Sequence, residues 1–233
     1  HLGNGELKII NLDYKNPVVS GQLDKSNSLR QLKGLNHSIE LCLSKKFDAL
    51  ITLPIHKKIL STKEIKFTGH TEYIADACSL KGNEVMLLSN KKLNVALATT
   101  HISLKDVPRK ITQKSLCNTI SILHNDLGKK FKIIDPKITV TGLNPHSGED
   151  GEFGNEEVRI IKPAIRKMQE LGISLNGPIP ADTAFTPKIM RNTDSYLTMY
   201  HDQGLAPFKA LAFGKGVNVT LGLPIIRTSV DHG

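Results

Sequence analysis

The chain has 233 residues, of which 39% are hydrophobic and 23% charged, the composition of an ordinary globular protein. No apolar run approaches the roughly 20 residues of a membrane-spanning helix, and no basic leader with an apolar stretch opens the chain. The three cysteines, Cys42, Cys78 and Cys117, contain no CxxC pair, which argues against a zinc ribbon or a disulfide framework. We therefore expect a cytoplasmic protein with no membrane partner.

The formal net charge of +9 comes from 31 Lys and Arg residues against 22 Asp and Glu residues. A lysine-rich solvated surface explains most of it, and part of it would attract a small anionic substrate. A nucleic-acid partner is disfavoured, because only 5% of residues are aromatic and no Arg-rich run with interleaved Phe or Tyr occurs. We expect no nucleic-acid partner.

Short apolar, β-branched runs alternate with helical stretches along the chain. The strands expected, in chain order, are Leu7–Asn11, Ala49–Leu53, Val85–Leu88, Val95–Thr99, Ile138–Leu143, Tyr196–Tyr200 and Val217–Leu221. Apolar residues spaced by three and four predict helices within Leu29–Leu43, Leu116–Leu127 and Val158–Leu171. This alternation indicates an α/β fold with a largely parallel sheet, and the continuous apolar runs indicate strands covered on both faces.

Three histidines come directly after three of these strands. His101 follows Val95–Thr99, His146 follows the strand that ends at Leu143, and His201 follows Tyr196–Tyr200. Ligands of open α/β sheets bind outside the carboxyl ends of the strands, so these imidazoles are expected in one crevice. A lone histidine is more often structural, but three with the same placement predict a shared divalent metal with an open coordination position.

The surrounding residues leave the details of the site open. The carboxylates of Asp182 and Asp202 are candidates to orient the imidazoles or to coordinate the ion directly. Three nitrogen ligands suit zinc, whereas added oxygen ligands suit magnesium, manganese or cobalt. No GxGxxG sequence follows a strand and opens a helix, so a Rossmann dinucleotide site has no support.

Six segments of the chain carry more specific strings. They are FTGHTE (67–72), ALATTH (96–101), GLNPHSGEDG (142–151), NGPIPADTAF (176–185), MYHDQGLAPFK (199–209) and GVNVTLGLPIIRTSVDHG (216–233). In this order, through nearly the whole chain, they resemble the 4-hydroxythreonine-4-phosphate dehydrogenase family of pyridoxal 5′-phosphate biosynthesis. The chain departs from the family pattern at Leu53 and Asp150, where the family usually has glycine.

The resemblance implies roles for particular residues. The family's metal histidines match His101, His146 and His201, and its substrate contacts match His70, Thr71, Lys209, Asn218 and Arg227. It also implies a two-domain α/β/α fold like that of isocitrate and isopropylmalate dehydrogenases, not a Rossmann fold. The expected domains are residues 1–68 with 203–233, and residues 69–202. A homodimer with the active site near the subunit interface is expected.

The implied reaction is the NAD- or NADP-dependent oxidation of 4-phosphohydroxy-L-threonine. Its β-keto acid product would lose CO₂ to give 3-amino-2-oxopropyl phosphate, with a divalent metal assisting. Asp182, Asp202 and Lys209 are the candidates for catalytic proton transfer. The alternatives are a sister dehydrogenase of threonate or erythronate 4-phosphate, a metal-dependent hydrolase and, least favoured, a nucleic-acid-binding module.

Overall fold

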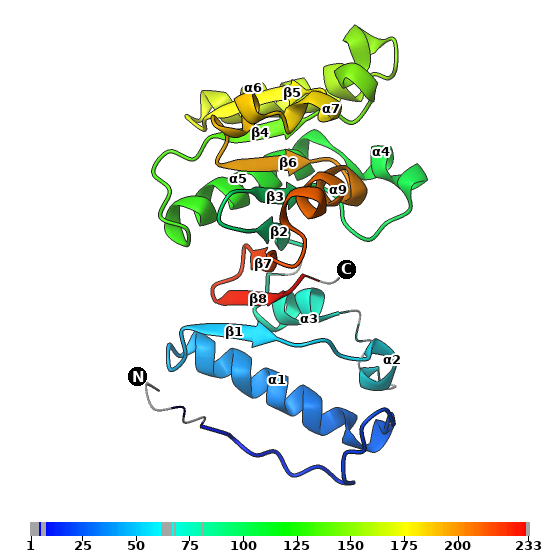
Figure 1. Cartoon of the computed structure of the whole chain (residues 1–233), viewed down its shortest axis with the longest axis vertical. Coiled ribbons are helices and arrows are strands. Elements are labelled where there is room, and N and C mark those ends of the chain that lie inside the picture. Colours follow the sequence, from blue (N-terminus) through cyan, green and yellow to red (C-terminus); the bar gives the residue numbers. More distant parts are fainter. Residues whose placement is uncertain (1–4, 6–7, 62–66, 68, 81, 232–233) are drawn as a thin grey trace.

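The structure is a computed structural model that describes residues 5, 8–61, 67, 69–80 and 82–231. One eight-stranded sheet runs along the long axis of the molecule, in the order β1-β8-β7-β2-β3-β6-β4-β5 (Figure 1). Its strands are β1 (Ala49–Thr52), β2 (Val85–Ser89), β3 (Asn94–Leu97), β4 (Ile138–Thr141), β5 (Leu175–Ile179), β6 (Ser195–Thr198), β7 (Val217–Leu221) and β8 (Ile226–Val230).

The strands that precede the three histidines are neighbours and are parallel. β6 pairs in parallel with β3 on one side and with β4 on the other, and β4 pairs in parallel with β5. β1 and β8 are also parallel, whereas β8, β7, β2 and β3 follow one another in antiparallel pairs. Most strand pairs among the described residues are thus parallel, and the α/β prediction is confirmed.

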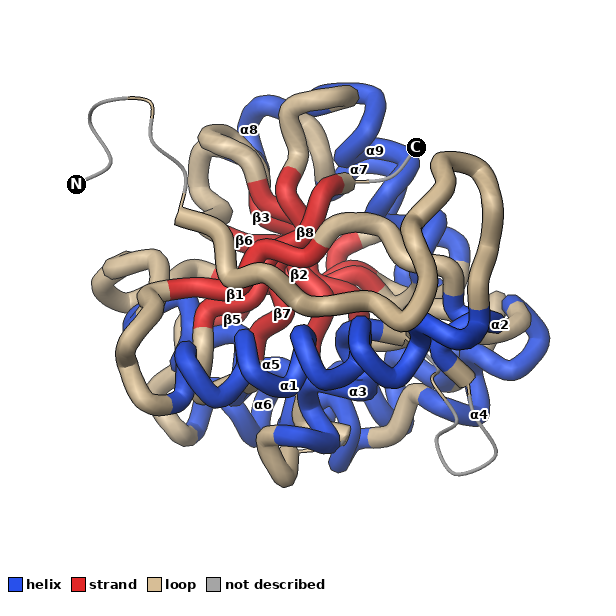
Figure 2. The backbone as a smooth tube through the Cα atoms, turned by 90° about the horizontal axis from the view of Figure 1, so that it is seen from below, coloured by secondary structure: helices blue, strands red, loops and turns tan. Residues whose placement is uncertain are grey.

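Helices cover both faces of this sheet (Figure 2). Helices α1 (Ser28–Leu43), α3 (His70–Ala77), α5 (Gln113–Lys129) and α6 (Lys162–Glu170) lie on one face, and α7 (Ala181–Ala184), α8 (Pro187–Met190) and α9 (His201–Ala212) lie on the other. The short helices are η1 (Lys25–Asn27), α2 (Lys57–Leu60), η2 (Leu104–Asp106), α4 (Val107–Lys110), η3 (Pro145–Gly151) and the π-helical η4 (Glu157–Ile161). The three helices expected from the apolar spacing are present.

Successive residues of one strand pack into different cores. Leu87 packs into the core beneath α5 and α6, whereas Leu88 packs into the core beneath α9, and both side chains are fully buried. On the neighbouring strand, Ala96 packs into the same core as Leu87, and Val95 packs into the same core as Leu88. Because side chains alternate across a strand, a strand covered on both faces must be apolar at every position. This explains the continuous apolar runs in the sequence.

Two strands were missed and one was wrongly expected. β5 contains Gly177 and Pro178, which disfavour a central strand, but β5 lies at the sheet edge, where proline is tolerated. β8 was also not predicted. In the segment expected as the first strand, Leu7 is outside the described residues, and residues 8–11 form no strand, with Ile9 and Ile10 largely exposed.

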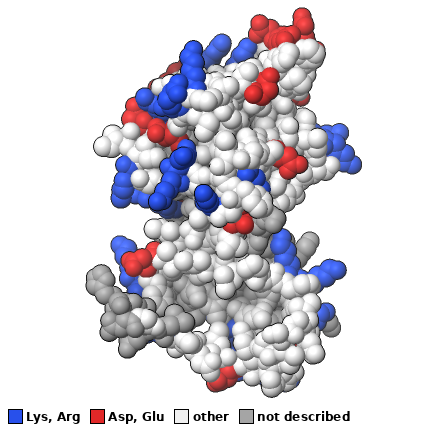
Figure 3. Space-filling model, viewed as in Figure 1, with Lys and Arg blue, Asp and Glu red and all other residues white. Residues whose placement is uncertain are grey.

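The predicted division into two domains stays a prediction. One sheet contains strands from both expected parts, since β7, from residues 203–233, pairs with β2, from residues 69–202. Among the described residues, no helix has both the length and the apolar character needed to cross a bilayer. Lys and Arg side chains lie at many separate places on the face shown in Figure 3, with Asp and Glu between them, as in a solvated surface.

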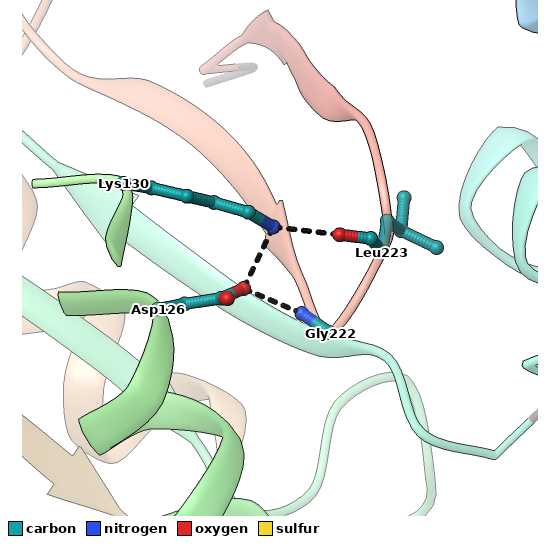
Figure 4. A network of polar contacts seen from close by, with 4 residues as sticks. All are labelled: Asp126, Lys130, Gly222 and Leu223. Atoms are coloured by element: carbon teal, nitrogen blue, oxygen red, sulfur yellow. Dashed lines mark hydrogen bonds and ion pairs between the residues drawn. The ribbon is translucent and has the colours of Figure 1, made fainter. Parts of the chain in front are cut away.

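The turn between β7 and β8 is tied to helix α5 by a polar network (Figure 4). The carboxylate of Asp126 accepts hydrogen bonds from the Gly222 amide and the Lys130 ammonium, both at 2.8 Å. Lys130 also donates to the carbonyl of Leu223 at 2.9 Å. Gly222 has φ +81°, and a Cβ there would lie 2.0 Å from the carbonyl oxygen of Asn83, so only glycine fits. The network thus fixes the hairpin that carries two predicted substrate residues.

Candidate active site

His101 and His201 meet at the carboxyl end of the sheet. Their ring centroids lie 5.5 Å apart. Backbone pairing between β3 and β6 continues past the strands, because the Ala98 amide donates to the Thr198 carbonyl at 2.8 Å. The buried hydroxyl of Thr99 then donates to the Met199 carbonyl at 2.7 Å. These bonds hold the two short loops together up to the histidines.

His146 is not gathered into a metal-binding group with this pair. Its side chain is 60% exposed, and its Nδ1 contacts the Glu149 carboxylate. The backbone is left-handed at His146, Ser147, Gly148, Glu149 and Asp150, so Asp150 takes a conformation that favours the glycine usual in the family. The position of this imidazole therefore depends on the unusual backbone of residues 146–150, and it cannot be predicted from the strand that precedes the loop.

Carboxylates support two of the three predicted metal ligands. The Asp202 carboxylate lies 2.7 Å from Nδ1 of His201, which leaves Nε2 to face a ligand, and Glu149 occupies Nδ1 of His146 in the same way. However, the part of the chain that the structure describes holds no group of three His, Cys, Asp or Glu side chains placed to bind one ion. The imidazoles of His101 and His201 lie close enough to suit two ligands of one ion. A metal site shared by all three histidines stays a prediction.

A cavity of about 410 Å³ opens beside the histidine pair. Three of the predicted residues, Asp202, Lys209 and Asn218, line it together with both histidines. His201 and Lys209 are two turns apart on α9, so they share one face of that helix. The remaining lining residues are Met86, Leu205, Ala206, Val230 and Asp231.

Asp231 belongs to this cavity although sequence reasoning did not select it. Its carboxylate lies 3.3 Å from the Lys209 ammonium, and the two side chains are 9% and 22% exposed. Asp231 directly follows β8, but the strand pairings make β8 antiparallel to β3 and β6. The strand-end rule that selected the histidines therefore does not place Asp231 beside them, and only the folded structure identifies it.

Arg227 forms a second, buried group of predicted substrate residues. It is only 4% exposed, and its guanidinium donates to the hydroxyls of Thr52 (2.7 Å), Thr220 (2.9 Å) and Thr71 (3.2 Å). Its Nε has no hydrogen-bond partner, and burial lowers the pKa of Arg227. Thr71 lies in the first turn of α3, where free amides and the helix dipole favour an anion. A buried cation beside a helix N-terminus suits a phosphate or carboxylate.

Arg227, Thr71 and His70 form what we call the anion-binding group, because we expect it to hold an anion. The charge of Lys57 acts both on this group and on the histidine pair. Burial, together with the positive charges of Arg227 and Lys57, lowers the pKa of His70 to about 4, so its imidazole is neutral at pH 7. Burial also lowers the pKa of His101, and His201 and Lys57 lower it further. Because Lys57 acts on both His70 and His101, the two groups are near neighbours. Lys57 was missed because it is an exposed lysine among many.

Asp182 lies apart from the cavity, on α7. The hydrogen bond and the charge of Glu149 raise the pKa of His146, and the charge of Asp182 adds a smaller effect in the same direction. Asp182 and His146 are therefore neighbours, whereas Asp202 and Lys209 belong with His101 and His201. Among the three candidates for proton transfer, the structure brings two into the cavity.

The comparisons with known proteins agree on one family. Residues 2–233 match the family described as pyridoxal phosphate biosynthetic protein PdxA. The chain is 47% identical over 229 residues to a curated 4-hydroxythreonine-4-phosphate dehydrogenase of Chromobacterium violaceum, covering 98% of this chain and 70% of that protein.

Solved structures with the same name share the fold. The crystal structure of 4-hydroxythreonine-4-phosphate dehydrogenase from Burkholderia phymatum is 41% identical with a TM-score of 0.81, and that from Klebsiella pneumoniae is 37% identical with a TM-score of 0.85. Each comparison covers 91% of this chain but only 64% of the solved chain. The predicted isocitrate/isopropylmalate dehydrogenase-like fold is confirmed. This chain belongs to the PdxA family of pyridoxal phosphate biosynthetic proteins.

Proposed function

We propose that the protein containing this chain oxidises 4-phosphohydroxy-L-threonine with NAD or NADP. The observation that carries the proposal is the 47% identity to a curated 4-hydroxythreonine-4-phosphate dehydrogenase over 98% of the chain. The site supports it chemically, because a buried arginine and a cavity with two imidazoles suit a small molecule with one phosphate and a reactive hydroxyl. We further propose that it works in the cytoplasm.

The anion-binding group would hold the phosphate. Arg227 offers its unpartnered Nε, and the first turn of α3 offers backbone amides. The neutral imidazole of His70 can donate a hydrogen bond to a phosphate oxygen without changing its own charge. Fixing one end of the substrate in this way converts its binding energy into orientation of the carbon that reacts.

The reaction has two steps. In the first, the hydroxyl-bearing carbon transfers a hydride to the nicotinamide ring and the hydroxyl loses its proton, which leaves a ketone. In the second, the carboxylate β to this ketone leaves as CO₂, its electron pair forms an enol, and protonation of carbon gives 3-amino-2-oxopropyl phosphate. The chain must therefore accept one proton and later return one, at the same end of the cavity.

Two residue pairs are candidates for these proton transfers. The carboxylate of Asp202 lies 2.7 Å from Nδ1 of His201 and can accept the hydroxyl proton, since Nε2 of His201 is reserved for the proposed metal. The ammonium of Lys209 is held by Asp231 in the same cavity and can return a proton or bind the substrate carboxylate. Asp182 is a weaker candidate, since it does not line this cavity.

The proposed divalent metal would be held by the imidazoles of His101 and His201. When bound, such an ion lowers the pKa of a coordinated hydroxyl and stabilises the enolate oxygen. We retain His146 as the proposed third ligand, and we propose a homodimer with the site near its interface.

The test is an assay of the full-length protein for NADH or NADPH formation, after chelation and with added Zn²⁺, Mg²⁺, Mn²⁺ or Co²⁺. We expect the highest kcat/KM with 4-phosphohydroxy-L-threonine and release of CO₂. Higher kcat/KM with threonate or erythronate 4-phosphate would favour the sister dehydrogenase. Phosphate release without a nicotinamide cofactor would indicate a hydrolase, and salt-sensitive oligonucleotide binding without turnover would indicate a nucleic-acid-binding module.

A further inference from the structure

Gln203 joins the ends of two strands that lead to histidines. It lies in the first turn of α9, and its side chain reaches across to the end of β4. Its Nε2 donates to the carbonyl of Gly142 at 2.8 Å. Its Oε1 accepts from the Met199 amide at 2.7 Å and from the Thr141 hydroxyl at 2.8 Å. One carboxamide thus bonds to the end of β4, through Thr141 and Gly142, and to the end of β6, through Met199.

The network continues to the third strand. The carbonyl of Met199 accepts the hydrogen bond of Thr99, at the end of β3. Hydrogen bonds therefore run from Gly142 through Gln203 and Met199 to Thr99. Met199 and Thr141 are completely buried and Thr99 is 8% exposed, so these bonds are shielded from water.

Each end of this network lies close in sequence to a candidate ligand. Thr99 and Met199 come two residues before His101 and His201, and Gly142 comes four residues before His146. The carboxylate of Glu157, which is fully buried, holds the next part of the His146 loop. It accepts from the Leu143 and Asn144 amides at 2.7 and 2.8 Å. The base of that loop is therefore fixed, although its tip is exposed.

We propose that Gln203 is a positioning residue that sets the separation between the His146 loop and the His101–His201 pair. The inference rests on the proposed function only where turnover is the readout. Glutamine suits this position because one flat group must both donate and accept. Without it, the buried carbonyl of Gly142 and the amide of Met199 lose partners, and the two loops are free to move relative to each other.

The experiment compares Gln203→Met with Gln169→Met in the full-length protein. Methionine keeps the length and the unbranched shape but removes the carboxamide. Gln169 is a matched control, because its Nε2 also donates to a backbone carbonyl, that of Leu175 at 3.0 Å, on the distant α6–β5 connection. The first readout is the set of imidazole ¹³C and ¹H chemical shifts in histidine-labelled protein at one pH, assigned with His146→Ala and His201→Ala. The second readout is steady-state kinetics.

We expect Gln203→Met to shift the signals of His146 and His201, while Gln169→Met leaves them unchanged. We expect kcat to fall about 100-fold, the cost of a small misplacement of reacting groups. KM should change little, since Arg227 and Thr71 remain intact. Imidazole signals that match those of the Gln169→Met control would overturn the proposal, whatever happens to kcat.

Failure of the proposed function gives a different result. A wild-type protein that forms no NADH or NADPH would refute the proposed function, while the imidazole shifts would still test the positioning role. If Gln203→Met does not fold, Thr141→Val is the second variant. Valine keeps the shape of threonine but lacks the hydroxyl that donates to Oε1 of Gln203. This variant should shift the His146 signal in the same direction by a smaller amount, and an unchanged signal would contradict the inference.

Discussion

The ammonium of Lys209 lies 3.3 Å from the carboxylate of Asp231, in the cavity that also contains His101 and His201. Under the proposed function, this pairing would hold a cation for the substrate carboxylate that leaves as CO₂. Lys209 lies on α9 and Asp231 directly follows β8, so the pair depends on how α9 lies against the end of β8.

We expect Asp231→Asn to lower kcat/KM by about 10- to 100-fold, because the ammonium of Lys209 loses the carboxylate charge that lies 3.3 Å from it. Steady-state kinetics will measure the change. Asp135→Asn is the matched control, since Asp135 is exposed, precedes the amino end of β4 and has a positive φ that asparagine tolerates. Equal kinetics for the two variants would show that Asp231 has no part in the site.

Arg227→Met should damage both binding and stability. Three threonine hydroxyls, of Thr52, Thr71 and Thr220, lose their donor, and a buried group left without a partner costs about 1–3 kcal/mol. We expect a KM for the phosphorylated substrate at least about tenfold higher, because the phosphate loses its buried cation. Urea unfolding and substrate titration will measure the two effects. An unchanged KM would place the phosphate elsewhere.

Stability should fall on acidification because of His70. Its pKa is lowered from 6.5 to about 4 in the folded chain, chiefly by burial. The unfolded chain therefore binds this proton first, and the contribution of His70 to stability is present above pH 6.5 and is lost as pH falls toward about 4. His70→Gln should flatten the dependence of the unfolding free energy on pH in this window. His37→Gln, on the exposed part of α1, is the control, and an equal slope in both variants would contradict the assignment.

Asp126→Asn should destabilise the chain without removing any group from the cavity. Asparagine keeps the shape of aspartate but loses the charge that holds Lys130 and strengthens the bond from the Gly222 amide. We expect a loss of about 1–3 kcal/mol in the free energy of unfolding. Chemical denaturation will measure it. A variant as stable as the wild type would show that the network of Figure 4 contributes nothing to holding the β7–β8 turn.

The sequence predicts the location of the site better than its internal geometry. The positions of His101 and His201 follow from local patterns, because each comes just after a continuous apolar strand in an α/β sheet. Helix α9 was not predicted, since Gly204 and Pro207 are poor helix formers. The structure gives a reason for Gly204, where a Cβ would lie 2.4 Å from the Thr198 hydroxyl, so the helix needs glycine to approach the sheet.

Contacts that join distant segments were beyond sequence reasoning. Arg227 meets hydroxyls from β1, β7 and α3, and no spacing along the chain encodes this arrangement. The resemblance named Arg227 and Thr71 as substrate contacts, which stays a prediction, and the structure shows a hydrogen bond between them that the sequence did not indicate. The position of His146 depends on five successive left-handed residues, which only the complete fold can stabilise.

Histidine substitutions should distinguish a metal site made of two imidazoles from one made of three. We expect His101→Ala and His201→Ala each to weaken Co²⁺ binding by at least about 100-fold, measured by visible absorption and calorimetry, because each removes a ligand from a close pair. We expect His146→Ala to abolish metal binding and turnover while the chain stays folded, with His37→Ala as the control. A His146→Ala protein that binds Co²⁺ normally would show that the pair alone holds the ion. In that case the Glu149 contact of His146 and its neighbour Asp182 would indicate a separate role for this loop.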